Sequence, residues 1–426
     1  MELIVFVIAL FGLLPLGIPI AVILIICSFV LMAFMGMFDL SVVSQQIVMG
    51  TNNFPLMAIP FFMLAGEIMS VGGLSKRIVS FANLAVGRVR GGLGYVAILA
   101  SMIFAGLSGS AVADAAALGA ILIPMMLANG YKPARAVGLI CAGAIIAPII
   151  PPSIPMIVLG SSVGLSISRM FMSGIVPGII IGLALFATWF VIVRIDGYKD
   201  VTRFSLKEAK DIIIDSVPAL VMPVMIIGGI RFGIFTPTES GAFAAVYALL
   251  ISLFWYREMT LADLPKAIGT TAVSTAIVML IVGAATAVGW YITVAQIPET
   301  LAGFFGGLMD SPVLLLISIN TFLLGMGMVM DLTPNLLIFG PVLLPVITQA
   351  GIDQYHFALV MVFNLCLGLI TPPVGTLLYL GCGMGNITLG SLIKGIMPFF
   401  VAELLLLLLF VLVPEIVLVP LKFIAG

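Results

Sequence analysis

Small hydroxyl side chains lie beside glycine and proline at four places in a chain whose surroundings are almost entirely apolar. Proline lacks a backbone N–H and clashes with the carbonyl one turn earlier, so it leaves carbonyl oxygens without helical partners. Neutral hydroxyl and carbonyl oxygens in a weakly charged setting suit a hard cation such as Na⁺. We therefore expect two or more sodium ions and no organic cofactor. The candidate sodium ligands are Ser108, Gly109, Ser110, Pro151, Ser153, Gly327, Met330, Asp331, Thr371, Pro372, Gly375 and Thr376.

Two acidic residues, Asp114 and Asp331, adjoin these places. A carboxylate at membrane depth costs about 2.5–3.5 kcal/mol on insertion scales unless it is paired or solvated. These residues can support an ion and substrate pocket, or they can cap the helix that follows them, and the sequence leaves both roles open. The candidate substrate-pocket residues are Asp114, Ser153, Thr333, Asn335 and Thr376.

The chain contains a second, divergent copy of itself. Pro151-Pro152 in the first half matches Pro372-Pro373, which lies 221 residues further along. Apolar segments interrupted by Gly or Pro at corresponding positions of two halves indicate the binding site of a membrane transporter. Asp114 aligns with Asn335, and Ser110 with Asp331, so the polar sets match better than the individual residues. The same shift aligns Gly106 with Gly327, Pro124 with Pro345, Gly130 with Gly351, Gly160 with Gly381, Gly164 with Gly385, Gly174 with Gly395 and Pro177 with Pro398.

The polar residues are carried by four apolar segments that are too short to cross a membrane. About 15 residues extend only about 22 Å at 1.5 Å per residue, against about 30 Å of hydrocarbon. Each pair of segments therefore predicts a re-entrant hairpin with its tip inside the membrane. The helix after each hairpin is expected to break at its prolines, at 148–155 and at 369–376. The hairpin segments are 92–107 with 115–128, and 312–328 with 336–350.

The composition is that of a membrane protein. Hydrophobic residues make up 62% of the chain and charged residues 8%, with a mean hydropathy of +1.34, whereas soluble domains have about 25% charged residues. We expect ten or more full spans plus half-spans, with 3–35 as the first membrane helix rather than a signal peptide. A net charge of −1 without a basic stripe argues against a nucleic-acid partner. Four cysteines in apolar context predict neither a disulfide framework nor a metal site.

The predicted fold class is an all-α polytopic membrane protein made of two inverted-topology repeats. A hydrophilic linker joins the repeats and, because it is rich in Lys and Arg, is predicted to face the cytoplasm. A second basic stretch, 75–90, is expected to lie along the membrane surface. The predicted units are the first repeat, 1–193 (scaffold helices 1–90, hairpin and broken helix 91–193), the linker, 194–217, and the second repeat, 218–426 (scaffold helices 218–310, hairpin and broken helix 311–426).

Three further residues attract attention. Arg231 and Glu239 flank a Gly- and Pro-containing stretch and could pair, either as a structural clamp at a helix start or as part of an anion site. His356, the single histidine, follows a loop, so we expect an interfacial side chain rather than a proton relay.

At this point the chain resembles the large membrane subunit (M subunit, DctM-like) of tripartite ATP-independent periplasmic (TRAP) transporters over essentially its whole length. The resemblance is carried by Gly106-Leu-Ser-Gly-Ser-Ala-Val-Ala-Asp114, the proline cluster 148–155, the Thr-Pro-Thr-Glu core of 233–241, the segment 327–335, and Gly368-Leu-Ile-Thr-Pro-Pro-Val-Gly375. Together these motifs are highly specific.

The resemblance implies sodium-coupled, secondary active uptake of an organic acid across the bacterial inner membrane. The substrate would be sialic acid, another sugar acid or a C4-dicarboxylate, delivered by a periplasmic substrate-binding protein (P-type). A transport unit carrying both hairpins would move as an elevator against a scaffold, the architecture of the ion-transporter superfamily. Because residue 1 opens almost directly into the first helix, the small membrane subunit (Q-type, about four helices) is expected to be a separate chain.

Three alternatives remain. The first is a two-component carboxylate carrier or antiporter without a binding protein. The second is an intramembrane enzyme, which would need a constellation such as GxSxG with a histidine, or a His-rich metal motif, and the lone His356 makes us expect no enzyme. The third is a channel, which occluding hairpins would serve poorly.

Overall fold

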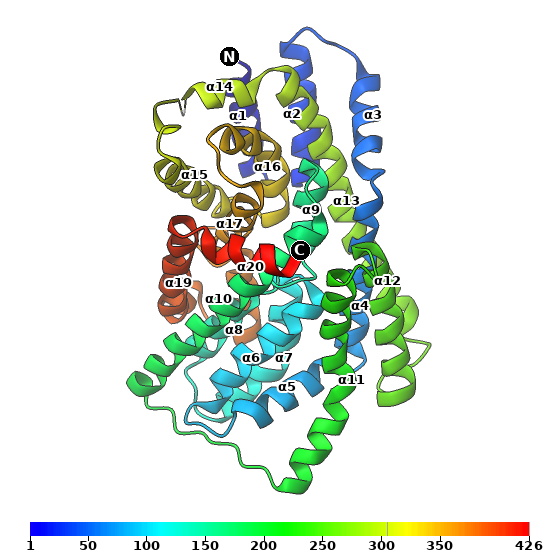
Figure 1. The fold of residues 1–426 in the computed structure, drawn as a ribbon, viewed down its shortest axis with the longest axis vertical. Coiled ribbons are helices and arrows are strands. Elements are labelled where there is room, and N and C mark those ends of the chain that lie inside the picture. Colours follow the sequence, from blue (N-terminus) through cyan, green and yellow to red (C-terminus); the bar gives the residue numbers. More distant parts are fainter. Residues whose placement is uncertain (305, 426) are drawn as a thin grey trace.

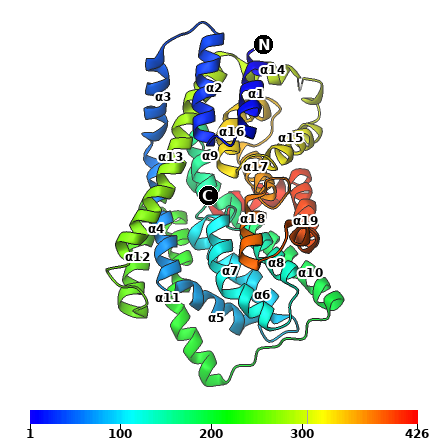
Figure 2. The same cartoon turned by 180° about the vertical axis from the view of Figure 1, so that it is seen from behind.

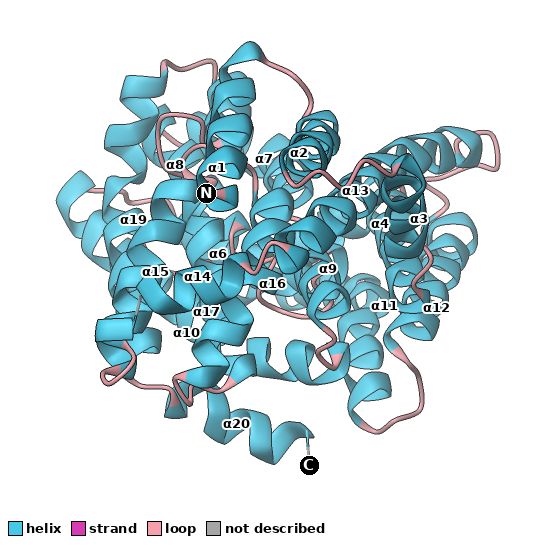
Figure 3. Cartoon of the chain, turned by 90° about the horizontal axis from the view of Figure 1, so that it is seen from above, coloured by secondary structure: helices cyan, strands magenta, loops and turns pink. Residues whose placement is uncertain are grey.

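The computed structural model describes residues 1–304 and 306–425. Within these ranges the chain is built from helices joined by loops, as Figure 3 shows. Eight of the described helices are long and apolar enough to cross a membrane, fewer than the ten or more full spans expected. They are Phe54–Val71, Ala111–Ala128, Ile167–Asp196, Leu206–Arg231, Pro237–Tyr256, Leu264–Val294, Leu332–Gln349 and Leu389–Leu412.

The expected first membrane helix, 3–35, is two helices. Helix α1 (Glu2–Leu13) ends in a short 3-10 turn, Leu14–Leu16, and α2 (Ile20–Phe34) runs back beside it (Figure 1). Pro15 and Pro19 interrupt the helical hydrogen bonds, and Gly17 takes a left-handed φ of 70°. A single helix of that length would exceed the thickness of a bilayer, so the break shortens the segment into a hairpin.

Two hairpins lie at opposite ends of the molecule. The first consists of α6 (Gly92–Ser108) and α7 (Ala111–Ala128), and the second of α15 (Pro312–Gly327) and α16 (Leu332–Gln349). Figures 1 and 2 show the two hairpins entering from opposite ends, with their tips directed at the middle of the protein. Their boundaries differ from the expected segments by only a few residues.

A broken helix follows each hairpin. The first consists of α8 (Pro133–Ala144) and α9 (Ile154–Val163), and the second of α17 (Gln354–Gly368) and α18 (Thr376–Gly385). In both breaks the two prolines are joined by a cis peptide bond. The second halves cross over: α9 packs against α16 of the second hairpin, and α18 packs against α7 of the first. The two halves of the chain are therefore interlocked.

The remaining elements surround the two hairpins and the two broken helices. The predicted linker, 194–217, is only partly a loop: α10 ends at Asp196, and the hydrophilic stretch after Ser205 is the first part of the long helix α11. The elements are α3 (Leu40–Thr51), a 3-10 turn Phe54–Met57, α4 (Ala58–Val71), α5 (Leu74–Val86), α10 (Ile167–Asp196), α11 (Leu206–Arg231), α12 (Pro237–Leu250) with a π-helical end Ile251–Tyr256, α13 (Leu264–Val294), α14 (Ile297–Phe304), a 3-10 turn Gly306–Leu308, α19 (Leu389–Leu412) and α20 (Glu415–Ala425).

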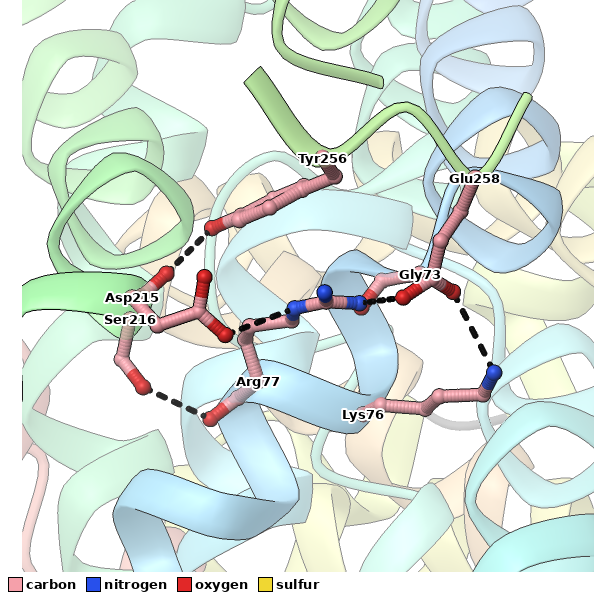
Figure 4. A network of polar contacts seen from close by, with 7 residues as sticks. All are labelled: Gly73, Lys76, Arg77, Asp215, Ser216, Tyr256 and Glu258. Carbon is pink, nitrogen blue, oxygen red and sulfur yellow. Dashed lines mark hydrogen bonds and ion pairs between the residues drawn. The ribbon is translucent and has the colours of Figure 1, made fainter. Parts of the chain in front are cut away.

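A polar network ties three distant segments together at the linker end (Figure 4). Arg77 on α5 donates through Nε to Asp215 at 3.0 Å and through Nη1 to Glu258, whose other oxygen lies 3.2 Å from the Lys76 ammonium. The Tyr256 hydroxyl donates to the backbone carbonyl of Asp215 at 2.7 Å, and its ring lies under the guanidinium, 4.3 Å away. Burial opposes ionisation of Glu258, but hydrogen bonds from Arg77 and Lys76 outweigh it and lower the pKa of Glu258.

Candidate functional site

The tip of the first hairpin lies directly against the proline break of its own repeat. Gly109 turns the chain between α6 and α7 with a φ of 62°, and its carbonyl accepts a hydrogen bond from the Ile154 N–H at 3.4 Å. A Cβ on Gly109 would lie 2.2 Å from the carbonyl oxygen of Pro152, so only glycine permits this approach. Ser110 caps α7, because its Oγ accepts from the Ala113 N–H at 3.4 Å. The structure thus brings together the candidate residues of 108–110 and 151–153.

The second hairpin repeats the arrangement. The Val374 N–H donates to the carbonyl of Met328 at 3.1 Å, and the Thr376 hydroxyl donates to the Asp331 carboxylate at 3.3 Å. Gly327 and Gly368 pack backbone to backbone, since a Cβ on Gly368 would lie 2.6 Å from Gly327. The candidate residues of 327–331 and 371–376 therefore also meet. Asp331 occupies the N-cap position of α16, but its carboxylate accepts no capping hydrogen bond.

Two of the candidate hydroxyls mainly satisfy backbone groups. Ser153 Oγ donates to the carbonyl of Pro148 at 2.5 Å and accepts from the Met156 N–H at 3.2 Å, which caps α9. Thr371 Oγ1 donates to the carbonyl of Leu367 at 2.6 Å. Both side chains are buried. Their protons are engaged, while the oxygen lone pairs of Thr371 remain available to a cation.

Asp114 and Asn335 are fully buried, and each has an oxygen without a hydrogen-bond donor. Asp114 accepts from the Ser108 hydroxyl through one carboxylate oxygen, and its Oδ2 has no partner among the described residues. Asn335 donates to the carbonyls of Met330 at 2.9 Å and of Asp331 at 3.0 Å, and its Oδ1 is likewise unpartnered. An unpaired buried oxygen is costly, and a bound cation would relieve that cost. The oxygen-rich composition of both tips fits Na⁺.

A cavity of about 440 Å³, lined by apolar as well as polar side chains, adjoins the first tip. One wall is made by the first hairpin, with Ser108 and Ser110 at its tip and alanines of α7, and the other by α4, the start of α5 and the start of α13. Two buried hydroxyls on that second wall, Ser75 and Thr271, have no hydrogen-bond partner within the described part of the chain. The polar groups of the second wall were not found by sequence reasoning, because they come from segments far apart in the chain. They are Glu67, Ser70, Ser75, Lys76, Thr270, Thr271 and Ser274.

The predicted substrate residues are spread over both tips. Asp114, Ser153 and Asn335 are fully buried, while Thr333 and Thr376 are partly exposed. None of these five side chains lines the 440 Å³ cavity. The structure therefore brings the sodium candidates into two clusters but does not gather the substrate candidates around one cavity.

Two smaller expectations were wrong. Glu239 does not pair with Arg231: it accepts from the Thr236 N–H and hydroxyl, both at 2.8 Å, in a capping box that starts α12. Glu239 therefore has a structural role at a helix start, as one of the two predicted roles had it, but its partner is Thr236 and not Arg231. His356 is buried rather than interfacial, because its Nε2 lies 2.7 Å from the carbonyl of Phe410 on α19.

Paired hairpins, broken helices and long apolar spans define a multi-pass membrane transporter. The chain matches the family model "Tripartite ATP-independent periplasmic transporter, DctM component" over residues 7–416. It belongs to this family, the large permease subunits of TRAP transporters.

Similar proteins agree with this assignment. The chain is 46% identical to the 2,3-diketo-L-gulonate TRAP transporter large permease protein YiaN of Escherichia coli, with 100% of both chains covered. It is 36% identical to the sialic acid TRAP transporter large permease protein SiaM of Vibrio cholerae, with 95% of each covered. Among solved structures, the Alcanivorax borkumensis YdaH transporter has a TM-score of 0.63 at 16% identity, covering 89% of this chain and 90% of that one, which shows similarity of fold alone.

Proposed function

We propose that this protein is the sodium-coupled large permease of a tripartite uptake system for an organic acid in the bacterial inner membrane. The observation that carries the proposal is the contact of each hairpin tip with the proline break of its own repeat, at 109–154 in the first and 328–374 in the second. Large permeases of this family work with a small membrane subunit and a periplasmic binding protein, and we extend both partners to this chain.

The ion sites are assigned to the two tips. Each tip offers carbonyl and hydroxyl oxygens and one fully buried side chain, Asp114 or Asn335, with an oxygen that lacks a donor. Helix ends at membrane depth add partial charges that favour ions. A sodium ion at each tip would satisfy the unpartnered oxygens and would link the sodium gradient to the conformation of the tips.

The cavity beside the first tip supports a polar, hydroxylated substrate. Seven polar side chains line its scaffold wall, and two of them are buried hydroxyls without partners. Hydroxyl groups of a sugar acid could hydrogen-bond to the exposed hydroxyls of this wall, at Ser70 and Thr270, whereas an unsubstituted C4-dicarboxylate has no hydroxyl to offer. The diketogulonate and sialic acid transporters among its relatives handle acids of this kind. A sugar acid is therefore the substrate class that we favour.

The position of the cavity supports an elevator motion. Its two walls belong to different bodies: the first hairpin on one side, and the scaffold helices α4 and α13 on the other. Sliding of the hairpins and broken helices against that scaffold would move the tip, with its ion and substrate, from one face of the membrane to the other.

Reconstituted uptake tests the proposal. The chain is placed in proteoliposomes with its small membrane subunit, the periplasmic binding protein is added outside, and labelled diketogulonate, sialic acid or succinate is offered under a Na⁺ or a H⁺ gradient. Uptake that requires both Na⁺ and the binding protein supports the tripartite function. Uptake without the binding protein indicates the two-component carrier, and uptake driven by H⁺ alone contradicts the sodium sites.

A further inference from the structure

The 440 Å³ cavity beside the first tip has one cation and one carboxylate among its described lining residues. The cation is Lys76, the third residue of α5, and the carboxylate is Glu67, in the second half of α4. The other lining residues are small, apolar or hydroxyl-bearing. A cavity of this size falls within the range of about 300–1,000 Å³ that is typical of small-molecule sites. It therefore offers an organic anion a single positive side chain within the described part of its wall.

Lys76 is placed where it can reach a bound molecule. Its side chain is 67% exposed although the residue lines the cavity, so it lies at the rim rather than in the packed interior. Arg77, the next residue, is only 17% exposed, bridges Asp215 and Glu258, and does not line the cavity. Figure 4 shows this division, with Arg77 at the centre of the network and Lys76 at one end, beside Glu258 alone. The arginine therefore holds α5 in place, while the lysine remains available to a ligand.

Glu258 keeps its other partners if Lys76 turns away. The Lys76 ammonium lies 3.2 Å from one oxygen of Glu258, while the Arg77 guanidinium donates to the other. The same carboxylate lies against the start of α5, because a Cβ on Gly73 would fall 2.3 Å from its Oε2. The partial positive charge of a helix N-terminus stabilises an anion at this place. An ion pair to an exposed lysine contributes little to stability, so Lys76 can exchange Glu258 for the carboxylate of a substrate at low cost.

Glu67 limits the charge of the substrate. It forms no ion pair within the described ranges, so its carboxylate is available to accept hydrogen bonds from the hydroxyl groups of a ligand. A second carboxylate on the ligand would find no further cation on the described wall and would be repelled by Glu67. The cavity therefore matches a molecule with one carboxylate and several hydroxyls better than a molecule with two carboxylates.

A lipid phosphate is the alternative partner of Lys76. The sequence placed the stretch 75–90 along the membrane surface, where lysines meet anionic headgroups. Two observations favour the substrate instead. Lys76 shares one cavity with the first tip and with the exposed hydroxyls of Ser70 and Thr270, and its partner in the structure is already a carboxylate, that of Glu258.

We propose that Lys76 binds the carboxylate of the substrate at the rim of this cavity, and that Glu67 accepts hydrogen bonds from the substrate hydroxyls and excludes a second carboxylate. This deepens the proposed function and rests on it. The substrate class is thereby narrowed from sugar acids in general to hydroxylated monocarboxylates, so that sugar diacids are excluded together with the simple dicarboxylates. Neither residue was a candidate from the sequence, because α4 and α5 were expected only as scaffold.

Binding of matched sugar acids tests the substrate class. D-Gluconate and D-glucarate share a carbon chain and most of their hydroxyls, but gluconate has one carboxylate and glucarate has two. Their dissociation constants, with those of diketogulonate, sialic acid and succinate, are measured by calorimetry on the chain purified with its small membrane subunit in Na⁺. We expect a monocarboxylate to bind most tightly, and gluconate to bind about tenfold more tightly than glucarate. Tightest binding of a dicarboxylate, or binding of none of the five, would overturn the proposal.

Substitution of Lys76 tests its role. Lys76→Ala should raise the dissociation constant of the tightest monocarboxylate about tenfold or more, and Lys76→Arg should recover most of the loss. Glu258→Gln should not weaken binding, because it removes the competing carboxylate and leaves the lysine. Lys266, which is exposed one turn before Thr270 on α13 and does not line the cavity, is the matched control, and Lys266→Ala should bind normally.

The contradicting outcomes are distinct. Equal losses of affinity in Lys76→Ala and Glu258→Gln would make their ion pair structural. Unchanged affinity in Lys76→Ala, measured in detergent without added phospholipid, would leave lipid headgroups as the partner of the lysine. Either result overturns the proposal.

Glu67→Gln provides the last measurement. It keeps an acceptor oxygen but removes the negative charge, so the preference for gluconate over glucarate should shrink about tenfold. An unchanged preference would contradict the role of Glu67. If the unmodified chain shows no uptake that depends on Na⁺ and on the binding protein, the proposed function itself fails. If it shows such uptake while the Lys76 and Glu67 variants bind normally, only this assignment fails.

Discussion

Asp114 and Asn335 hold corresponding positions in the two hairpins, 221 residues apart, and each reaches back from the first turn of the second arm to the end of the first, to Ser108 and to the carbonyl of Met326. Both are fully buried, and each keeps one oxygen without a donor. One is an acid and the other an amide. The two tips therefore share a geometry, and each has one carboxylate, at Asp114 in the first and at Asp331 in the second.

The charge of Asp114 should matter to sodium. Asp114→Asn removes the carboxylate from a site that we assign to a cation, so we expect the apparent sodium affinity of uptake to fall by about tenfold, or about 1.4 kcal/mol. The measurement is uptake against sodium concentration, with thermal unfolding at several sodium concentrations as a readout independent of transport. The exchange Asn335→Asp is the matched control at the other tip. An unchanged sodium response in Asp114→Asn would place the ion elsewhere.

Ser110 caps a helix as well as lining a candidate ion site, so its two roles must be separated. Ser110→Ala should cost about 1 kcal/mol of stability from the lost cap and should also weaken sodium dependence. Ser166 caps α10 with the same geometry, Oγ to the Arg169 N–H at 3.4 Å, away from either tip. Ser166→Ala should therefore show the stability loss alone.

The proline break that contacts the second tip carries a hydroxyl, on Thr376, that does not cap a helix. Thr376→Ala, which removes the bond to Asp331, should lower sodium dependence with little change in stability. Uptake across a sodium titration and the melting temperature give the two readouts. A melting temperature that falls while the sodium response stays normal would make Thr376 structural.

Gly109 should not tolerate substitution, because its left-handed φ favours glycine and because the Pro152 carbonyl leaves no space for a Cβ. Gly109→Ala would place a methyl group 2.2 Å from the Pro152 carbonyl, so the tip and the break would separate and uptake would be lost. Gly130→Ala provides the control: its φ of 81° is equally left-handed, but nothing lies within 4 Å, so it should cost only about 1–2 kcal/mol. Similar uptake by the two variants would argue against close tip contact.

Within the polar network of Figure 4, Arg77 should contribute more to the stability of the protein than Lys76 does. Arg77 is 17% exposed and bridges two carboxylates, whereas Lys76 is 67% exposed. Arg77→Ala should cost about 1–3 kcal/mol, and Lys76→Ala about 0–1 kcal/mol. The melting temperatures of the two variants in detergent make the comparison, and equal losses would contradict it.

Low pH should weaken the Arg77 network, because it protonates Glu258. The pKa of Glu258 is lowered in the folded protein, so its stabilising effect is complete above the unfolded value of about 4.3 and is lost as pH falls through the folded value. The stability difference between the wild type and Glu258→Gln should be constant from pH 8 to about pH 5 and shrink below that. A difference that grew on acidification would reverse the sign of this linkage.

The parts of the fold set by local chemistry could be predicted from the sequence. Proline and glycine impose their breaks wherever they stand, so both hairpins and both broken helices were expected close to their observed boundaries. The break at Pro15 and Gly17 was missed because apolar residues continue on both sides, and composition alone does not distinguish one long helix from two short ones.

Features that depend on tertiary packing could not be predicted. His356 is buried, and its Nε2 hydrogen-bonds to the carbonyl of Phe410, 54 residues away in the sequence. The cavity wall combines α4, α5 and α13, which no sequence period connects. Arg231 and Glu239 could have paired because they are close in sequence, but the Glu239 carboxylate accepts the Thr236 N–H in the capping box of α12.

The crossing of α9 onto α16 and of α18 onto α7 makes the two halves mutually dependent. Gly340 on α16 closely faces Leu159 on α9, and Gly119 on α7 closely faces Met384 on α18, so each half leaves an apolar seam bare when the other is missing. A chain cut in the loop 197–205 should therefore remain assembled when both fragments are made together, and neither fragment should be soluble in detergent alone. Each half of the chain therefore supplies the surface against which the broken helix of the other half packs.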